Sequence, residues 1–117
     1  YSAGILLDMV GDANLQIYQE MNSRRFAPKL IQQFWAIARR IDVKEFYAQT
    51  RHEVRDDHLP LNEIAKIPTI DIIDFDYPSP RHRETYWHTT EDTVDKCSAV
   101  SLAHVGCVTL AWLKSIQ

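Results

Sequence analysis

The chain of 117 residues lacks the features that mark several large classes of protein. No apolar run approaches the roughly 20 residues that a membrane-spanning helix needs, so no segment is predicted to cross a membrane. Positive charge is also scarce, because the net charge is −3 and the single basic run, residues 81–83, is short. Binding to a polyphosphate requires a basic surface, so we do not expect a nucleic acid as a partner.

Cysteine is almost absent, with Cys97 and Cys107 as its two representatives. They form no C-x-x-C motif and no zinc-knuckle spacing. On a helix, ten residues place them about 15 Å apart, too far for a disulfide, whose Cα atoms lie within about 7 Å. We therefore expect two free thiols, with Cys107 as a small core residue. A signal-like segment is absent as well, so no targeting signal predicts a location.

Two apolar runs, residues 3–10 and 67–75, stand out in what the chain does contain. Such runs are typical of strands covered on both faces, as in a parallel or mixed sheet between helices. Between them, apolar residues recur every three or four positions up to Ile41. This pattern predicts an amphipathic helix that Ser23 caps, with Pro28 near its first turn. Residues 43–54 show only weak alternation and predict an edge strand.

Two further helices are predicted by their caps. Asp56 or Asp57 can cap a short helix with Pro60 in its first turn, and Ser98 can cap a closing helix that ends near Ser115. The expected apolar face of the closing helix consists of Leu102, Val105, Gly106, Thr109, Leu110, Trp112, Leu113 and Ile116.

This order of elements predicts one α/β domain over residues 1–117, a layered, mixed and mostly parallel sheet flanked by helices. Two clear strands make a thin sheet, and the chain opens at Tyr1 directly into the first of them. We therefore expect further chain or a partner to complete the sheet.

Three polar positions stand where chemistry is common, and each has two interpretations. Asp8 lies near the end of a buried strand, where a carboxylate either hydrogen-bonds the next loop or takes part in a site. Asp56, in the run Asp-Asp-His-Leu-Pro-Leu, either caps a helix or adds a carboxylate beyond what capping requires. His88, beside Trp87, is either an exposed loop residue or a metal ligand beyond a strand's end. Asp71 and Asp74 are predicted to face opposite sides of their strand, so at least one needs a partner.

Three motifs in order resemble the C-terminal half of the family-28 zinc metallopeptidases, which comprise zinc aminopeptidases and animal-type glutaminyl cyclases. They are Leu-Leu-Asp-Met-Val-Gly at residues 6–11, Asp-Asp-His-Leu-Pro-Leu at 56–61 and Trp-His-Thr-Thr-Glu-Asp-Thr at 87–93. The resemblance covers essentially the whole chain. It implies a phosphorylase/hydrolase-like zinc-peptidase fold of which only the C-terminal half is present.

The resemblance also implies roles for single residues. His88 matches the family's last zinc ligand. Asp8 matches an aspartate that ligates a second zinc in two-metal aminopeptidases and handles protons in cyclases. Asp56 matches an acid that hydrogen-bonds within the cyclase site, and Trp87 matches an indole that lines the substrate pocket. The cofactor implied is zinc, which activates water or polarises a carbonyl, and the substrate implied is a peptide. A secreted or periplasmic location is implied too.

The chain departs from the family pattern in one respect. The family's first histidine and aspartate ligands, and its paired glutamates, lie upstream of the matched segment and have no counterpart in residues 1–117. A catalytic zinc usually takes three protein ligands, whereas this chain offers His88 and Asp8. We expect the isolated chain to be inactive, with a missing N-terminal half or another chain completing the site.

Three functions fit these residues. A zinc aminopeptidase that hydrolyses N-terminal residues is the first prediction, because residues 89–93 follow the peptidase form of the closing motif. A glutaminyl cyclase that forms N-terminal pyroglutamate is the second, because of the double acid at Asp56 and Asp57 and the indole at Trp87. The third is a non-catalytic binding module or an inactive fragment.

Overall fold

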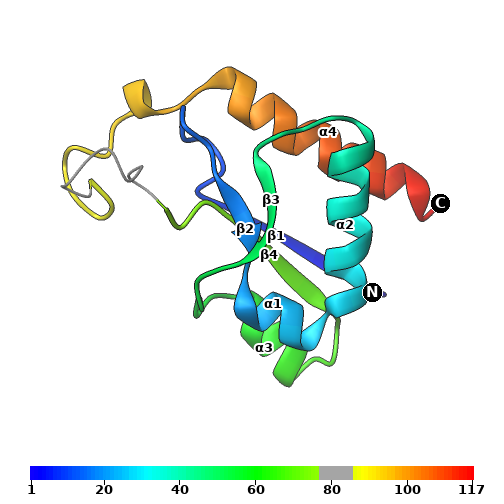
Figure 1. Cartoon of the computed structure of the whole chain (residues 1–117). Coiled ribbons are helices and arrows are strands. Elements are labelled where there is room, and N and C mark those ends of the chain that lie inside the picture. Colours follow the sequence, from blue (N-terminus) through cyan, green and yellow to red (C-terminus); the bar gives the residue numbers. More distant parts are fainter. Residues whose placement is uncertain (77–85) are drawn as a thin grey trace.

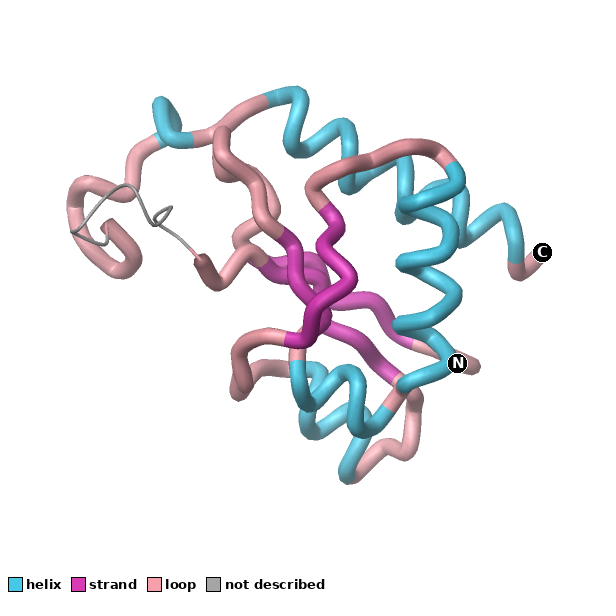
Figure 2. The backbone as a smooth tube through the Cα atoms, viewed as in Figure 1, coloured by secondary structure: helices cyan, strands magenta, loops and turns pink. Residues whose placement is uncertain are grey.

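The computed structural model describes residues 1–76 and 86–117 as an α/β arrangement (Figures 1 and 2). The basic run at residues 81–83 lies outside the described residues. Parallel strands occupy the middle of the fold, and helices flank them. The elements in chain order are β1 (Gly4–Asp8), β2 (Ile17–Gln19), α1 (Met21–Phe26), α2 (Pro28–Arg40), β3 (Phe46–Thr50), α3 (His58–Glu63), β4 (Thr69–Ile73), a 3₁₀ turn (Val94–Lys96) and α4 (Ala99–Ser115).

The strands form two parallel ladders. β1 pairs with β4 from Gly4↔Thr69 to Asp8↔Ile73, so both strands end at the same edge. β2 pairs with β3, which confirms a strand within residues 43–54. The backbones of β1 and β4 approach closely at Gly4, where an added Cβ would lie 2.6 Å from Thr69 Oγ1. The predicted α/β class with a parallel sheet is confirmed, although the strands form two two-stranded ladders and not one sheet.

The predicted single helix over residues 23–41 is wrong in its boundaries, because the chain forms two helices there. Ala27 has φ −133° and interrupts the helical path, and Pro28 starts α2, where the missing N–H of proline costs nothing. Glu20 caps α1 in place of Ser23 by accepting the backbone N–H groups of Asn22 (2.9 Å) and Ser23 (2.6 Å). Ser23 is buried inside α1, where its hydroxyl receives the Asp71 N–H (2.9 Å).

The hydrophobic core lies between the strands and the pair α2 and α4, which pack against each other (Figure 1). Phe34 of α2 is fully buried, and its ring lies 5.9 Å from that of Phe46 and 6.3 Å from that of Trp112. Trp35 is also buried, as predicted, and its indole N–H donates to the Tyr47 carbonyl (2.8 Å). The smaller helices α1 and α3 lie together against β4.

Ser98 caps α4, as predicted, by accepting the Val100 N–H at 3.2 Å. The predicted apolar face of α4 is wrong in part. The buried residues are Ser101, Val105, Val108 and Trp112, whereas Leu102, Leu110, Leu113 and Ile116 are exposed. Cys107 is exposed as well, which contradicts its prediction as a core residue, while both thiols are free as expected. α4 is thus apolar on more than the face that it buries.

The segment after β1 is tied to the segment before α4. Asp12 and Cys97 form an antiparallel bridge, Ser98 N–H donates to the Gly11 carbonyl (2.8 Å), and Ala13 N–H donates to the Lys96 carbonyl (2.9 Å). These bonds bring the loop that contains His88 back toward the end of β1. In residues 1–76 and 86–117, no helix has the length and hydropathy that crossing a membrane requires.

Candidate active site

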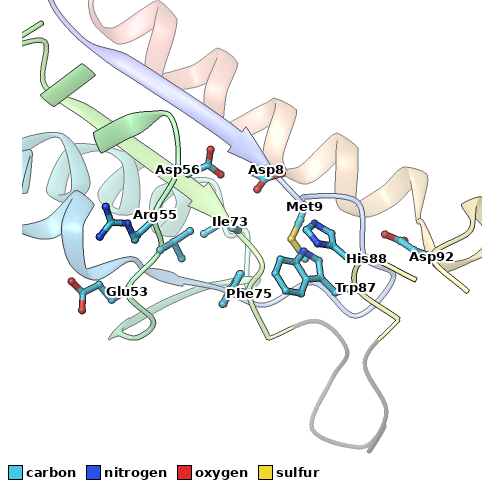
Figure 3. Close-up of a pocket in the computed structure, with 11 residues that line it drawn as sticks. Asp8, Met9, Glu53, Arg55, Asp56, Ile73, Phe75, Trp87, His88 and Asp92 are labelled. Atoms are coloured by element: carbon cyan, nitrogen blue, oxygen red, sulfur yellow. The ribbon is translucent and has the colours of Figure 1, made fainter. Parts of the chain in front are cut away.

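A pocket of about 500 Å³ opens beyond the ends of β1 and β4 (Figure 3). Loops that follow the carboxyl ends of parallel strands are the usual place for a site in α/β folds. All four residues singled out in the sequence, Asp8, Asp56, Trp87 and His88, lie on its wall. The other lining residues are Met9, Glu53, Val54, Arg55, Ile73, Phe75 and Asp92.

Asp8 and Asp56 point their carboxyl groups toward each other across this pocket (Figure 3). Burial raises the pKa of Asp8, and the neighbouring carboxylate of Asp56 raises it further through its charge and a hydrogen bond. Two carboxyl groups in this arrangement can share one proton. The pair can therefore accept a proton and return it.

Capping does not account for Asp56. Asp57 holds the N-cap position of α3, yet no side chain caps that helix end. The Asp56 carboxylate accepts the Asp57 N–H (2.7 Å) and otherwise faces the pocket. Asp8 accepts the backbone N–H of Met9 in the loop that follows β1, as its first interpretation predicts, and it also lines the pocket.

His88 is placed on the pocket wall by a tight turn. The Thr89 N–H donates to the Tyr86 carbonyl (3.1 Å), and His88, the third residue of the turn, has φ 57°. In such a turn this position usually belongs to glycine or asparagine. The imidazole stacks on the indole of Trp87 with 3.9 Å between centroids, and Trp87 in turn packs edge-on against Phe75.

Met9 also has a left-handed backbone, with φ 51°. This conformation is unfavourable for a long L side chain, and such strained residues concentrate at functional sites. Met9 follows Asp8 directly and lies between Asp8 and His88 in the pocket (Figure 3). Two of the strained residues of the described chain therefore lie on one pocket wall.

The donor set for zinc is incomplete in this chain. Neutral imidazole and carboxylate are suitable zinc ligands, and His88 and Asp8 lie on the same pocket. Among the described residues, however, no group of three or more histidine, cysteine, aspartate or glutamate side chains converges as a metal site would require. The residues present do not fit a catalytic zinc by themselves.

The two aspartates of the second predicted strand, Asp71 and Asp74, are both buried. Asp74 accepts the N–H groups of Gln16 (2.9 Å) and Asp76 (3.0 Å). Burial raises its pKa to about 7, although these two hydrogen bonds act to lower it. Asp71 is fully buried and faces the ring of His58. Burial raises its pKa to about 7, and only His58 opposes that shift.

The sequence did not single out several pocket residues, notably Glu53, Arg55 and Phe75. Residues 53–55 follow a weakly alternating strand and carry no motif of their own. Their place on the wall depends on the tertiary position of α3. The one available signal was the Asp-Asp-His run, since three ionisable side chains exceed what a helix cap needs.

Solved structures that this chain resembles include glutaminyl cyclases and an aminopeptidase precursor. The glutaminyl cyclase of Porphyromonas gingivalis is 32% identical, with a TM-score of 0.90 over 99% of this chain and 42% of its own. A leucine aminopeptidase precursor from Bacteroides thetaiotaomicron is 36% identical, with a TM-score of 0.84 over 93% of this chain and 36% of its own. The glutaminyl cyclase of the same organism, bound to N-acetylhistamine, is 36% identical, with a TM-score of 0.85 over 93% of this chain and 37% of its own.

The chain thus spans less than half the length of these relatives. No curated protein sequence matches it. Residues 1–113 match the family model described as Peptidase family M28. The family predicted from the three motifs is confirmed, and the chain belongs to peptidase family M28.

Proposed function

We propose that residues 1–117 are the C-terminal part of a single zinc-peptidase-like domain that acts as a glutaminyl-peptide cyclotransferase. The observation that carries this proposal is the carboxyl pair of Asp8 and Asp56 at the pocket, next to the indole of Trp87. The sequence alone placed an aminopeptidase first. The facing carboxyl groups favour the cyclase.

Cyclisation requires a proton to move. The α-amine of an N-terminal glutamine attacks its own side-chain carbonyl carbon, a C–N bond forms, and the bond to the amide nitrogen breaks to release ammonia. One proton must leave the attacking amine, and one must reach the departing nitrogen. Two facing carboxyl groups, with the pKa of Asp8 raised above its ordinary value by burial and by its neighbour, suit this transfer. Trp87, exposed over 40% of its surface, offers an apolar wall to the glutamine side chain.

A complete site needs more protein than this chain supplies. Leu7 of β1 is 43% exposed, and α4 carries leucines on its outer side, although a helix that is apolar all round is normally buried all round. These surfaces support a partner, either an upstream half of the same enzyme or another chain, that covers them. In our proposal that partner brings the zinc ligands which join His88 and Asp8. The relative described as a precursor supports an extracytoplasmic location.

An aminopeptidase remains the second candidate. The closing motif at residues 89–93 and the 36% identity to a leucine aminopeptidase precursor favour it. The two reactions differ in their nucleophile, since a peptidase uses water and a cyclase uses the substrate's own amine. They also differ in product, which makes them separable in one assay.

The test uses a chimera in which this chain replaces the matching 42% of the P. gingivalis cyclase. With an N-terminal glutamine peptide we expect ammonia and a pyroglutamyl product. Asp56→Asn should lower kcat by on the order of 100-fold or more, because it removes a proton carrier. Asp57→Asn, which changes the exposed neighbouring carboxylate, is the matched control and should retain activity. Release of free leucine from a leucyl peptide, without cyclisation, would overturn the proposal in favour of the peptidase.

The 117-residue chain alone should neither turn over substrate nor hold zinc tightly, because two ligands are fewer than a catalytic zinc takes. Isothermal titration with zinc checks this expectation. Stoichiometric binding below micromolar concentration would contradict it and show that the chain contains a full ligand set.

A further inference from the structure

A histidine of the second motif, His58, lies buried near the carboxyl pair and does not line the pocket, and the family resemblance gave it no role. His58, the first residue of α3, is 0% exposed. Its Nε2 lies 3.3 Å from Glu20 Oε2, and its Nδ1 lies 3.8 Å from Asp71 Oδ2. Both carboxylates are as buried as the ring, at 1% and 0% exposed.

Several hydrogen bonds fix the orientation of the Glu20 carboxylate. Its Oε2 accepts the Ser23 N–H (2.6 Å) and the Ser23 hydroxyl (2.7 Å), and its Oε1 accepts the Asn22 N–H (2.9 Å). These bonds join Glu20 to the start of α1. The carboxylate is therefore oriented before it meets His58.

The two oxygens of Glu20 hold the two ends of one pocket-lining segment. Oε1 accepts the Val54 N–H (3.0 Å), and Oε2 contacts the His58 ring. The Asn22 side chain adds a second bond at the Val54 end by donating to its carbonyl (3.1 Å). Between these two anchors lie Arg55 and Asp56, both on the pocket wall.

The carboxylates around His58 explain how an imidazole that can carry a positive charge is stable when it is fully buried. The acidic groups that face it are Glu20 ahead of α1, Asp71 on β4 and Asp56 ahead of α3. Among the buried residues of the described chain, His58 is the only one that can carry a positive charge. Burial lowers the pKa of His58, but the contact with Glu20 and the charge of Asp71 raise it by more, so the net direction is upward. A buried charge is stable only when it is paired in this way.

We propose that Glu20 and His58 form a clamp on residues 54–58 that aligns the Asp56 carboxyl group with Asp8. His58 is thus a positioning residue, because it acts through Asp56 and does not itself line the pocket. The clamp itself consists of contacts within this chain and does not depend on the proposed function. Only the catalytic role of the aligned Asp8–Asp56 pair rests on that function.

The experiment compares side-chain carboxyl ¹³C spectra of the 117-residue chain and its variants at one pH. His58→Gln removes the ring and its charge, and we expect the signals of Asp56 and Asp8 to shift. The matched control is His104→Gln. It breaks another histidine–carboxylate pair, His104 with Glu45 (2.6 Å), which lies outside the pocket lining, and it should leave both signals in place.

Glu20→Gln provides a second variant that keeps an acceptor for the Val54 N–H but loses the charge that faces His58. If the clamp acts as a unit, Glu20→Gln moves the same two signals, and the double variant moves them no further than His58→Gln does. A His58→Gln or Glu20→Gln chain that loses stability while the Asp56 and Asp8 signals stay unchanged would overturn the proposal, because the cluster would then be structural only. Neither result depends on turnover, so an inactive chimera would count against the cyclase and leave this inference standing.

Discussion

Met9 and His88 both have left-handed backbone, and both line the pocket. Neither residue type favours this conformation, so the surrounding structure must impose it. At His88 the Tyr86–Thr89 turn imposes it, and at Met9 the change of direction after β1 does. Met9 directly follows Asp8, and His88 is itself a predicted metal ligand, so both strained residues lie at positions predicted to carry the chemistry.

The strain at Met9 can be measured by a pair of substitutions. Met9→Gly and Met9→Ala both remove the long side chain, but only glycine also removes the Cβ that opposes φ 51°. We expect Met9→Gly to be more stable than Met9→Ala by about 1 kcal/mol, the cost of a left-handed L residue. Urea denaturation at neutral pH gives both values. Equal stabilities, or a more stable alanine variant, would show that Met9 is not strained.

Single residues also set the limit of what could be predicted from the sequence. Asp8, Asp56, Trp87 and His88 were found because each stands in a motif, and all four line one pocket. Glu20 and Asp71 carry no such motif. Their role depends on His58, which is buried only because α3 packs against β4. A contact between residues so far apart in the chain leaves no local pattern.

Among the elements, β1, β4 and α4 were predictable because their signals are strong. A run of apolar residues indicates a buried strand, and Ser98 has the form of a helix cap. The boundary between α1 and α2 was missed because an amphipathic pattern continues through the break at Ala27. The outer face of α4 was misjudged because apolar residues occur on all sides of that helix, so their periodicity does not select the buried side.

α2 should carry much of the stability of the fold. Phe34 is fully buried and its ring lies against those of Trp35, Phe46 and Trp112. We expect Phe34→Ala to lower the free energy of unfolding by about 3–5 kcal/mol, through lost burial and the cavity left behind.

The matched control for Phe34 is Phe26→Ala at the end of α1. Phe26 is only partly buried, with Arg25 over its ring, so its truncation should cost clearly less. Denaturation curves of the two variants provide the comparison. An equal loss at both positions would mean that the aromatic cluster around Phe34 is not the main core.

For the molecule as a whole, buried carboxyl groups set the response to pH. The pKa of Asp71 is about 7 in the fold against an ordinary value near 3.8, so the folded state binds more protons than the unfolded state between these values. Stability must then fall as pH rises through that range. The raised pKa of His58 acts in the same direction, because its stabilisation is complete below the unfolded pKa and is lost as pH rises through the folded one.

We therefore predict that the free energy of unfolding decreases from about pH 5 to pH 8, and that Asp71→Asn flattens this slope. Glu20 determines how stability responds to acid. Burial raises its pKa, but the His58 contact and three backbone N–H groups outweigh that effect and lower the pKa to about 2. Its stabilisation is present above pH 4.5 and is lost as the pH falls toward 2. Chemical denaturation at a series of pH values measures both trends. A stability that rises between pH 5 and pH 8 would contradict the assignment.

The pairing of β1 with β4 also has a consequence for how the chain is made. Within the described part of the chain, the strand that pairs with β1 (Gly4–Asp8) is β4 (Thr69–Ile73), with all of α1, α2 and α3 between them. A ribosome adds roughly 5–20 residues per second, so the apolar first strand waits several seconds for its neighbour to emerge. Contacts this distant in sequence also make folding slow. During that interval the strand is a natural target for chaperones, and a stalled ribosome would leave it exposed to aggregation.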